Sequence, residues 1–195
     1  MIRNMHRAPS LGIATLLLFA VGCSMGGDDY TPARFDIQDT TAIMRGIIDE
    51  STPAQVTRLI NDHPQVTVIV MQDVEGSVDD EANVRASRMV RAQGYRTHVP
   101  SDGLIASGGT DFFVAGTTRT VEPGARVGVH SWADGNGTEG SELPETHPDH
   151  ALYLNYYAEM GIPAGFYWFT LNAAPASDIY WMTEAELIQY SIVTQ

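Results

Sequence analysis

The sequence predicts an α/β domain with a mostly parallel sheet. Residues 65–72, QVTVIVMQ, form a β-branched run without charge, which is typical of a strand buried on both faces. The amphipathic segment 79–94 follows it, and strand-like segments 96–99 and 125–129 come later. This alternation of strands and helices favours βαβ units with flanking helices.

The N-terminal segment 1–22 is expected to be an export signal. Arg3 and Arg7 precede the apolar stretch LGIATLLLFAVG, whose length fits a signal core and is short for a membrane span. The segment ends in AVGC, which resembles a bacterial lipobox, so Cys23 is expected to carry lipid and to become the first mature residue. Ser24 then favours the outer membrane over the inner, by resemblance to sorting rules. The alternative is a free cysteine near an ordinary cleavage site.

The remainder is expected to be a polar tether over 23–33 and one domain over 34–195. The net charge of −13 makes nucleic acid an unfavourable partner, because phosphate binding needs clustered positive charge. The chain contains no lysine, which excludes Ser–Lys and Schiff-base catalysis within one chain. Its single cysteine excludes an intramolecular disulfide and a thiolate metal cluster.

The first two helices are predicted from their ends. Thr52 is a candidate N-cap, with Pro53 at the first position of a helix that runs to about residue 61. The helix over 79–94 has acids in its first turn and arginines later, which suits the helix dipole, and Gly94 ends it. The sequence TDFFVAG, 110–116, indicates a short buried helix.

The C-terminal third is expected to be largely helical. The loop 131–148 is rich in glycine and acids, and 149–161 is expected to be a helix with aromatic faces. Pro163 is expected to start another helix. Thr183 and Glu186 have the spacing of a capping box for a last helix.

Three glycine- or histidine-bearing segments follow predicted strands: DVEGSVDD, IASGG and GVHSW. Sites in open α/β sheets form beyond the carboxyl ends of the strands, so Gly76, Ser107 and His130 are expected to converge. An acyl-transfer site needs a nucleophile, a base and amides that face the oxyanion. Ser107, His130, and the amides of Gly76 and Gly108 could supply them. Alternatively, Ser107 only caps a helix and His130 only hydrogen-bonds a neighbour.

The segment HPDH places His147 and His150 three residues apart with a carboxylate between them. On a helix this spacing could bind a metal, but such a pair in an acidic loop is more often solvated surface. We therefore expect no metal site and no cofactor.

The stretch IASGGTDFFVAGTTRTVEPGARVGVHSW resembles the core of the ClpP/crotonase superfamily, especially the Clp protease proteolytic subunit and exported ClpP-like proteins of Gram-negative bacteria. The resemblance runs from about residue 65 to 193 and implies the ClpP/crotonase fold. It implies Ser107 as nucleophile and His130 as base, and Gly76 matches the glycine that donates an oxyanion amide. Val74 and Glu75 stand where the family has proline and glycine.

The resemblance also implies a triad acid. The segment SDIYWMTEAELIQYSIV is similar to the family's last Asp-aromatic-Met segment, and Asp178 falls at the acid, one residue further from Met182 than in Clp proteases. The string ASGG also resembles signal peptide peptidase A, whose serine is activated by lysine. Since this chain has no lysine, His130 is the candidate base.

The expected function is therefore an envelope-located serine hydrolase, acting as a peptidase on a peptide or other acyl substrate from the periplasmic side of the outer membrane. The alternative is a catalytically inactive ClpP-like binding or assembly module. Clp proteins form rings and crotonases form trimers. The resemblance therefore allows a homo-oligomer, and the sequence does not decide between these assemblies and a monomer. A crotonase-like reaction on CoA esters is disfavoured by export, because CoA is cytosolic.

Overall fold

The structure is a computed structural model of the chain, and it describes residues 30–194. The expected signal segment, Cys23 and most of the expected tether lie outside the described residues. Among the helices of residues 30–194, none is both long enough and apolar enough to cross a membrane.

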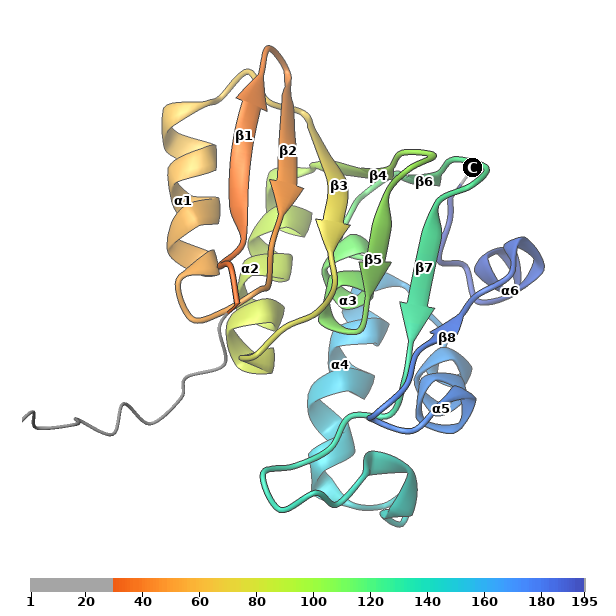
Figure 1. The fold of residues 1–195 in the computed structure, drawn as a ribbon. Helices are drawn as coiled ribbons and strands as arrows, with labels where there is room; N and C mark the ends of the chain where they lie inside the picture. The colour runs from red at the N-terminus through yellow and green to blue at the C-terminus, as the bar shows by residue number, and fades with distance from the viewer. Residues whose placement is uncertain (1–29, 195) are drawn as a thin grey trace, which may run out of the picture.

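One eight-stranded sheet organises the described chain, with a main order β1-β2-β3-β5-β7-β8 (Figure 1). Pairing is parallel from β2 through β3 and β5 to β7, and antiparallel between β1 and β2 and between β7 and β8. The main strands are β1 (Arg34–Gln38), β2 (Thr41–Arg45), β3 (Val68–Val74), β5 (Leu104–Ala106), β7 (Arg126–Val129) and β8 (Tyr180–Trp181).

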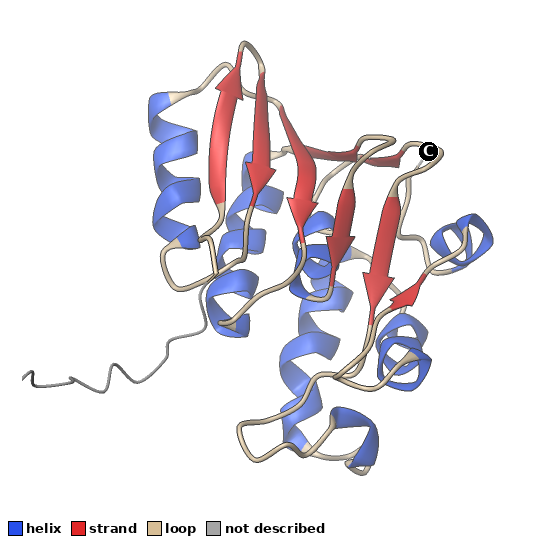
Figure 2. Ribbon diagram, in the orientation of Figure 1, coloured by secondary structure: helices blue, strands red, loops and turns tan. Residues whose placement is uncertain are grey.

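The sheet forks at β3. The first residues of β3, from Val68 to Val70, pair with β4 (Arg96–Val99), whereas Asp73 and Val74 pair with β5. β4 in turn pairs with β6 (Arg119–Val121). Figure 2 shows β4 and β6 leaving the plane of the main strands behind β5. The carboxyl halves of β3, β5 and β7 are thus adjacent.

The helices cover the sheet and extend below its carboxyl edge in Figure 1. α2 packs between α1 and α3, and α4 packs against α5. The helices are α1 (Thr52–Asp62), α2 (Asp80–Gln93), α3 (Gly108–Phe113), α4 (Ala151–Met160), α5 (Ala164–Ala173) and α6 (Glu184–Gln189), with short 3-10 turns at Gly140–Glu142 and Pro148–His150.

Local sequence signals account for most helix ends. Asp79 caps α2 by accepting from the Ala82 N–H at 2.8 Å, and Gly94 ends it in the left-handed region at φ +80. The capping box of Thr183 and Glu186 forms at α6 as predicted. The prediction for Thr52 was one position out, because Thr52 is the first residue of α1.

Two strands were not anticipated from the sequence. β1 forms an antiparallel hairpin with β2, and β5 stands between β4 and the serine turn. The strand that leads into Ser107 is therefore β5, and the segment 96–99 belongs to the other branch of the fork. With three residues, β5 is too short to show a periodicity that could be recognised.

The packing of α3 against β3 gives a prediction. A Cβ at Gly109 would overlap the Val74 carbonyl oxygen, which is backbone and cannot rotate away. We expect Gly109→Ala to lower the free energy of unfolding by about 1–3 kcal/mol in urea denaturation. Gly165→Ala in α5 is the control, because a Cβ there meets nothing within 4 Å and alanine favours helix. Equal stability of Gly109→Ala and wild type would contradict the close contact.

Candidate active site

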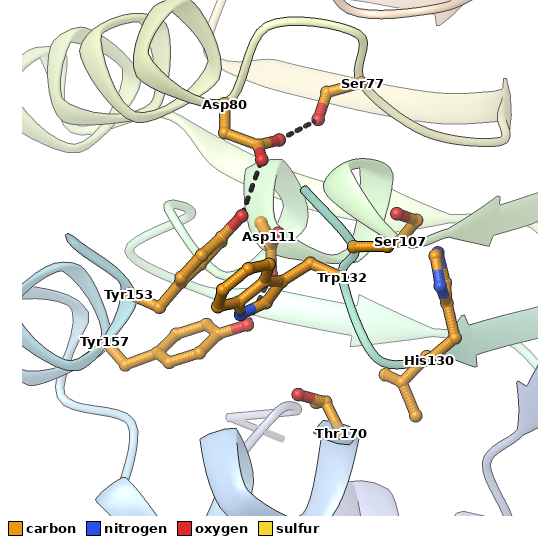
Figure 3. Close-up of a pocket in the computed structure, with 11 residues that line it drawn as sticks. Ser77, Asp80, Ser107, Asp111, His130, Trp132, Tyr153, Tyr157 and Thr170 are labelled. Atoms are coloured by element: carbon orange, nitrogen blue, oxygen red, sulfur yellow. Dashed lines mark hydrogen bonds between the residues drawn. The ribbon is translucent and has the colours of Figure 1, made fainter. Parts of the chain in front are cut away.

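A pocket of about 170 Å³ opens at the carboxyl ends of β3, β5 and β7. Its lining includes Ser77 after β3, Ser107 after β5 and His130 after β7. Figure 3 shows these side chains together with those of α2, α3 and α4. The predicted convergence of the three turns thus occurs in the structure.

Ser107 lies in a strained turn between β5 and α3. Its backbone has φ +53 and ψ −128, a conformation that residues other than glycine rarely adopt. Two hydrogen bonds to the Gly128 carbonyl oxygen hold this turn against β7: one from the Ser107 N–H at 3.1 Å and one from Thr110 Oγ1 at 2.8 Å. The Ser107 side chain makes no capping hydrogen bond to α3, so the simple helix-cap interpretation is not supported. A strand–turn–helix with a strained serine at its apex presents the hydroxyl outward.

Two glycine amides lie beside Ser107. A Cβ at Gly76 would be 3.7 Å from Ser107 Cβ and 3.9 Å from its Oγ, so Gly76 directly faces the hydroxyl. A Cβ at Gly108 would overlap Ser77, so only glycine lets the start of α3 approach this loop. Within residues 30–194, neither the Gly76 N–H nor the Gly108 N–H donates a backbone hydrogen bond. An amide without an acceptor can bind an oxyanion that is placed beside it.

The loop that carries Gly76 is fixed by the chain before α1. The Ile48 N–H donates to the Gly76 carbonyl oxygen at 3.0 Å, and the Val78 N–H donates to the Ile48 carbonyl oxygen at 2.8 Å. This short parallel bridge holds the loop in shape, although Val74 and Glu75 stand where the superfamily that the sequence resembles has proline and glycine. On the other side, Asn83 Nδ2 of α2 donates to the Gly108 carbonyl oxygen at 2.8 Å.

His130 follows the last residue of β7, and its ring points toward Ser107 in Figure 3. Its Nδ1 lies 2.7 Å from the Ser131 carbonyl oxygen. Because a carbonyl oxygen only accepts, Nδ1 carries the proton, and the neutral ring keeps Nε2 as an acceptor. Among the hydrogen bonds of the described residues, none joins Ser107 Oγ to His130. The pair shares a pocket without a direct bond in this state.

Asp178 is not brought against His130. It lies in the exposed turn between α5 and β8, where its Oδ1 accepts from the Ile179 N–H at 2.8 Å. No hydrogen bond or ion pair in residues 30–194 joins it to His130, and it does not line the pocket. The group in contact with His130 Nδ1 is instead the carbonyl of Ser131, a fully buried residue.

The far side of the pocket carries two carboxylates and two phenols that sequence reasoning missed. Tyr157 donates to Asp111 at 2.5 Å, and Tyr153 donates to Asp80 at 2.5 Å. Burial raises the pKa of Asp111 to about 7, against the lowering effect of the Tyr157 hydroxyl. Burial likewise raises the pKa of Tyr153 and of Tyr157 well above the ordinary value, so both phenols stay protonated donors.

A sequence signal existed for one of these residues. Asp111 stands one helical turn after Ser107 and directly before the buried Phe112 and Phe113. A carboxyl group beside a fully buried pair indicates a functional or strongly hydrogen-bonded acid. Asp80 and the tyrosines could not be placed, because their meeting depends on how α4 packs against α2.

The two histidines of the HPDH segment form hydrogen bonds to neighbouring groups of the chain. His150 is buried, with its Nδ1 2.6 Å from the Tyr167 hydroxyl and its Nε2 3.1 Å from the Pro144 carbonyl oxygen. His147 instead accepts from the Asp149 N–H. In the part of the chain that the structure describes, no group of three acidic, histidine or cysteine side chains could hold a metal ion.

No family model and no curated protein match this chain. The solved structures that are similar to this chain include two of the 1510-N membrane-bound stomatin-specific protease. The first, a lysine-to-alanine mutant in complex with a substrate peptide, has a TM-score of 0.51 and 16% identity, covering 76% of this chain and 71% of that chain. The second, a serine-to-alanine mutant, has a TM-score of 0.51 and 15% identity, covering 76% and 75%.

These similarities show the fold. The chain has the mixed α/β architecture of ClpP/crotonase-like proteases, as the sequence predicted. One of those mutants replaces a lysine. No lysine can stand at the equivalent position here, because this chain contains none.

The raised pKa of Asp111 gives a prediction for stability. The folded state holds the Asp111 proton more tightly than the unfolded state does. The contribution of Asp111 to the free energy of unfolding is therefore most favourable at low pH, and it is lost as the pH rises toward about 7. Asp111→Asn cannot ionise and keeps an acceptor for Tyr157. We expect the stability of this variant relative to wild type to rise by roughly 2–4 kcal/mol between about pH 4 and pH 8. Urea denaturation across that range measures the difference, and a constant difference would contradict the raised pKa of Asp111.

Proposed function

We propose that the chain is a serine hydrolase that cleaves peptide bonds. The observation that carries the proposal is the setting of Ser107. Its backbone is held at φ +53, it lies beside two glycines whose N–H groups donate no backbone hydrogen bond within the described chain, and it shares a pocket with His130. A strained backbone at a non-glycine residue persists only where the surrounding structure holds it, and such residues cluster at active sites. The likeness to protease structures, which shows the fold, agrees with this chemistry.

The proposed reaction is acyl transfer to water. Ser107 Oγ attacks the carbonyl carbon while its proton passes to His130 Nε2, and the carbonyl π electrons move to the oxygen. The amides of Gly76 and Gly108 stabilise that oxyanion. When the tetrahedral intermediate collapses, His130 gives the proton to the leaving amine. A water molecule then repeats the sequence on the acyl-enzyme and releases the acid.

The carbonyl of Ser131 takes the orienting role expected of Asp178. It fixes the His130 tautomer through the 2.7 Å contact at Nδ1. Ser131 is itself held: its N–H donates to the Ala174 carbonyl oxygen at 2.9 Å, and its hydroxyl donates to the Trp132 carbonyl oxygen at 3.1 Å. A neutral carbonyl stabilises the imidazolium less than a carboxylate does, so we infer a slower enzyme than one with a complete triad.

A binding or assembly module is the second candidate. It is favoured by the missing hydrogen bond between Ser107 Oγ and His130 in the described residues. Catalytic hydrogen bonds often tighten only once substrate is bound, which is why hydrolysis remains the leading proposal.

A fluorophosphonate probe tests the mechanism, because it reacts only with an activated serine. We expect labelling of the wild type, none in Ser107→Ala, and a rate about 10²–10⁴-fold lower in His130→Ala. Asp178→Asn should label at nearly the wild-type rate. Labelling that persists in Ser107→Ala would remove the mechanism, and a loss in Asp178→Asn equal to that in His130→Ala would restore the aspartate to the triad.

We also propose that the chain is a lipoprotein facing the periplasm, anchored through Cys23 to the outer membrane. The support is the sequence AVGC after an apolar segment. In a Gram-negative host, metabolic labelling with an alkynyl fatty acid should mark the wild type and not Cys23→Ala, and the wild type should fractionate with outer membrane. Equal labelling of both, or none of either, would contradict lipidation at Cys23.

A further inference from the structure

The pocket beside Ser107 has a strongly acidic side. Asp80 and Asp111 line it together with Ser107, and Figure 3 shows both carboxylates on the side away from His130. They come from different helices, Asp80 from the start of α2 and Asp111 from α3. Among the described residues that line the pocket, none is an arginine. The field inside the pocket therefore favours a positive group.

Asp111 has capacity for one more donor. Its Oδ1 accepts from the Tyr157 hydroxyl at 2.5 Å, while no hydrogen bond within residues 30–194 reaches its Oδ2. This oxygen is not one of the fully buried atoms without a partner in the described residues, so a group that enters the pocket can reach it. Burial raises the pKa of Asp111 to about 7, and nearby Asp80 adds to the effect. An incoming cation would favour the ionised carboxylate and form a charge-assisted hydrogen bond with it.

In contrast, each carboxylate oxygen of Asp80 accepts a hydrogen bond from a neutral donor. Its Oδ1 accepts from Ser77 Oγ at 2.6 Å and its Oδ2 from the Tyr153 hydroxyl at 2.5 Å. These contacts fix the position of the carboxylate without cancelling its charge. Asp80 therefore contributes a fixed negative charge to the pocket and links the Gly76 loop to α4.

Aromatic rings form the remaining wall of this side. Trp132 and Tyr153 both line the pocket, with ring centroids 6.2 Å apart and an interplanar angle of 17°. These rings add apolar surface to the pocket, which suits the aliphatic stem of a long side chain. Apolar walls combined with a carboxylate at the end favour an amphipathic cationic side chain over a purely apolar one.

We propose that this pocket selects substrates with a lysine- or arginine-like side chain next to the attacked carbonyl, bound through Asp111 Oδ2 and the fixed charge of Asp80. The inference rests on the proposed serine hydrolase function. With the acyl carbon at Ser107, the side chain runs along Trp132 to the carboxylates on the opposite side of the pocket. Asp111 is the specificity-determining residue.

The test uses three fluorophosphonates whose alkyl chains have the same length and end in an ammonium, a methyl or a carboxylate group. The second-order rate of Ser107 labelling is measured for each at neutral pH. We expect the ammonium probe to react about tenfold faster than the methyl probe, as one charge-assisted hydrogen bond implies, and the carboxylate probe to react slowest.

Substitutions of the two pocket carboxylates test whether the preference for the ammonium probe arises in the pocket. In Asp111→Asn, the ratio of ammonium to methyl rates should fall close to one. Asp80→Asn should lower the same ratio in part, and it provides a second reading if Asp111→Asn does not fold. The matched control is Asp62→Asn, which removes an equal charge at the exposed end of α1 and should leave the ratio unchanged. A ratio unchanged in both pocket variants would overturn the assignment.

The outcomes separate this inference from the proposed function. Equal rates for the ammonium and methyl probes in the wild type, or a preference for the methyl probe, would overturn the cationic preference while leaving the serine hydrolase intact. No labelling by any probe, or labelling that survives Ser107→Ala, would overturn the proposed function and this inference with it.

Discussion

The close contact between the start of α3 and the end of β3 is the constraint on which the site depends. Gly109 leaves no room for a Cβ against the Val74 carbonyl, and Gly108 leaves none against Ser77. With these two glycines, α3 begins directly beside the loop after β3, and the preceding residue is forced into its unusual backbone conformation. The strain at Ser107 and the proximity of the Gly76 amide are thus two results of one packing requirement.

The two sides of the pocket are built differently. The proposed reactive side is rich in backbone groups: it consists of glycine amides, a strained turn and the Ser131 carbonyl, which lies against the His130 ring. The opposite side consists of side chains whose phenols hold carboxylates from α2 and α3. The backbone groups depend on residue identity mainly at the glycines that shape the turn, whereas every group on the opposite side is a side chain. The chemistry can therefore persist while the acidic side changes with substrate.

The sequence alone was sufficient for the α/β class, most helix ends, and the meeting of Gly76, Ser107 and His130, because all three follow parallel strands. It was insufficient for β5, which is too short to show a periodicity. Asp178 was assigned by motif similarity, and strand register does bring its segment near β7, with Val129 opposite Tyr180. A motif does not fix where a side chain in an exposed turn points. Asp80 and Tyr153 lie 73 positions apart, so their contact exists only after α4 has packed.

The fork in the sheet has a consequence for motion. Because β3 pairs with β4 over one half and with β5 over the other, α3 fills the angle between two diverging branches, with Phe112 and Phe113 fully buried in it. A local opening around Ser107 would have to expose this wedge and separate the branches at once. Loops that carry functional residues usually open at little cost, but this turn is continuous with the buried packing of α3. The Ser107 amide, which donates to the Gly128 carbonyl oxygen, should therefore exchange slowly with solvent, whereas the Gly108 amide, which has no backbone acceptor in residues 30–194, should exchange faster.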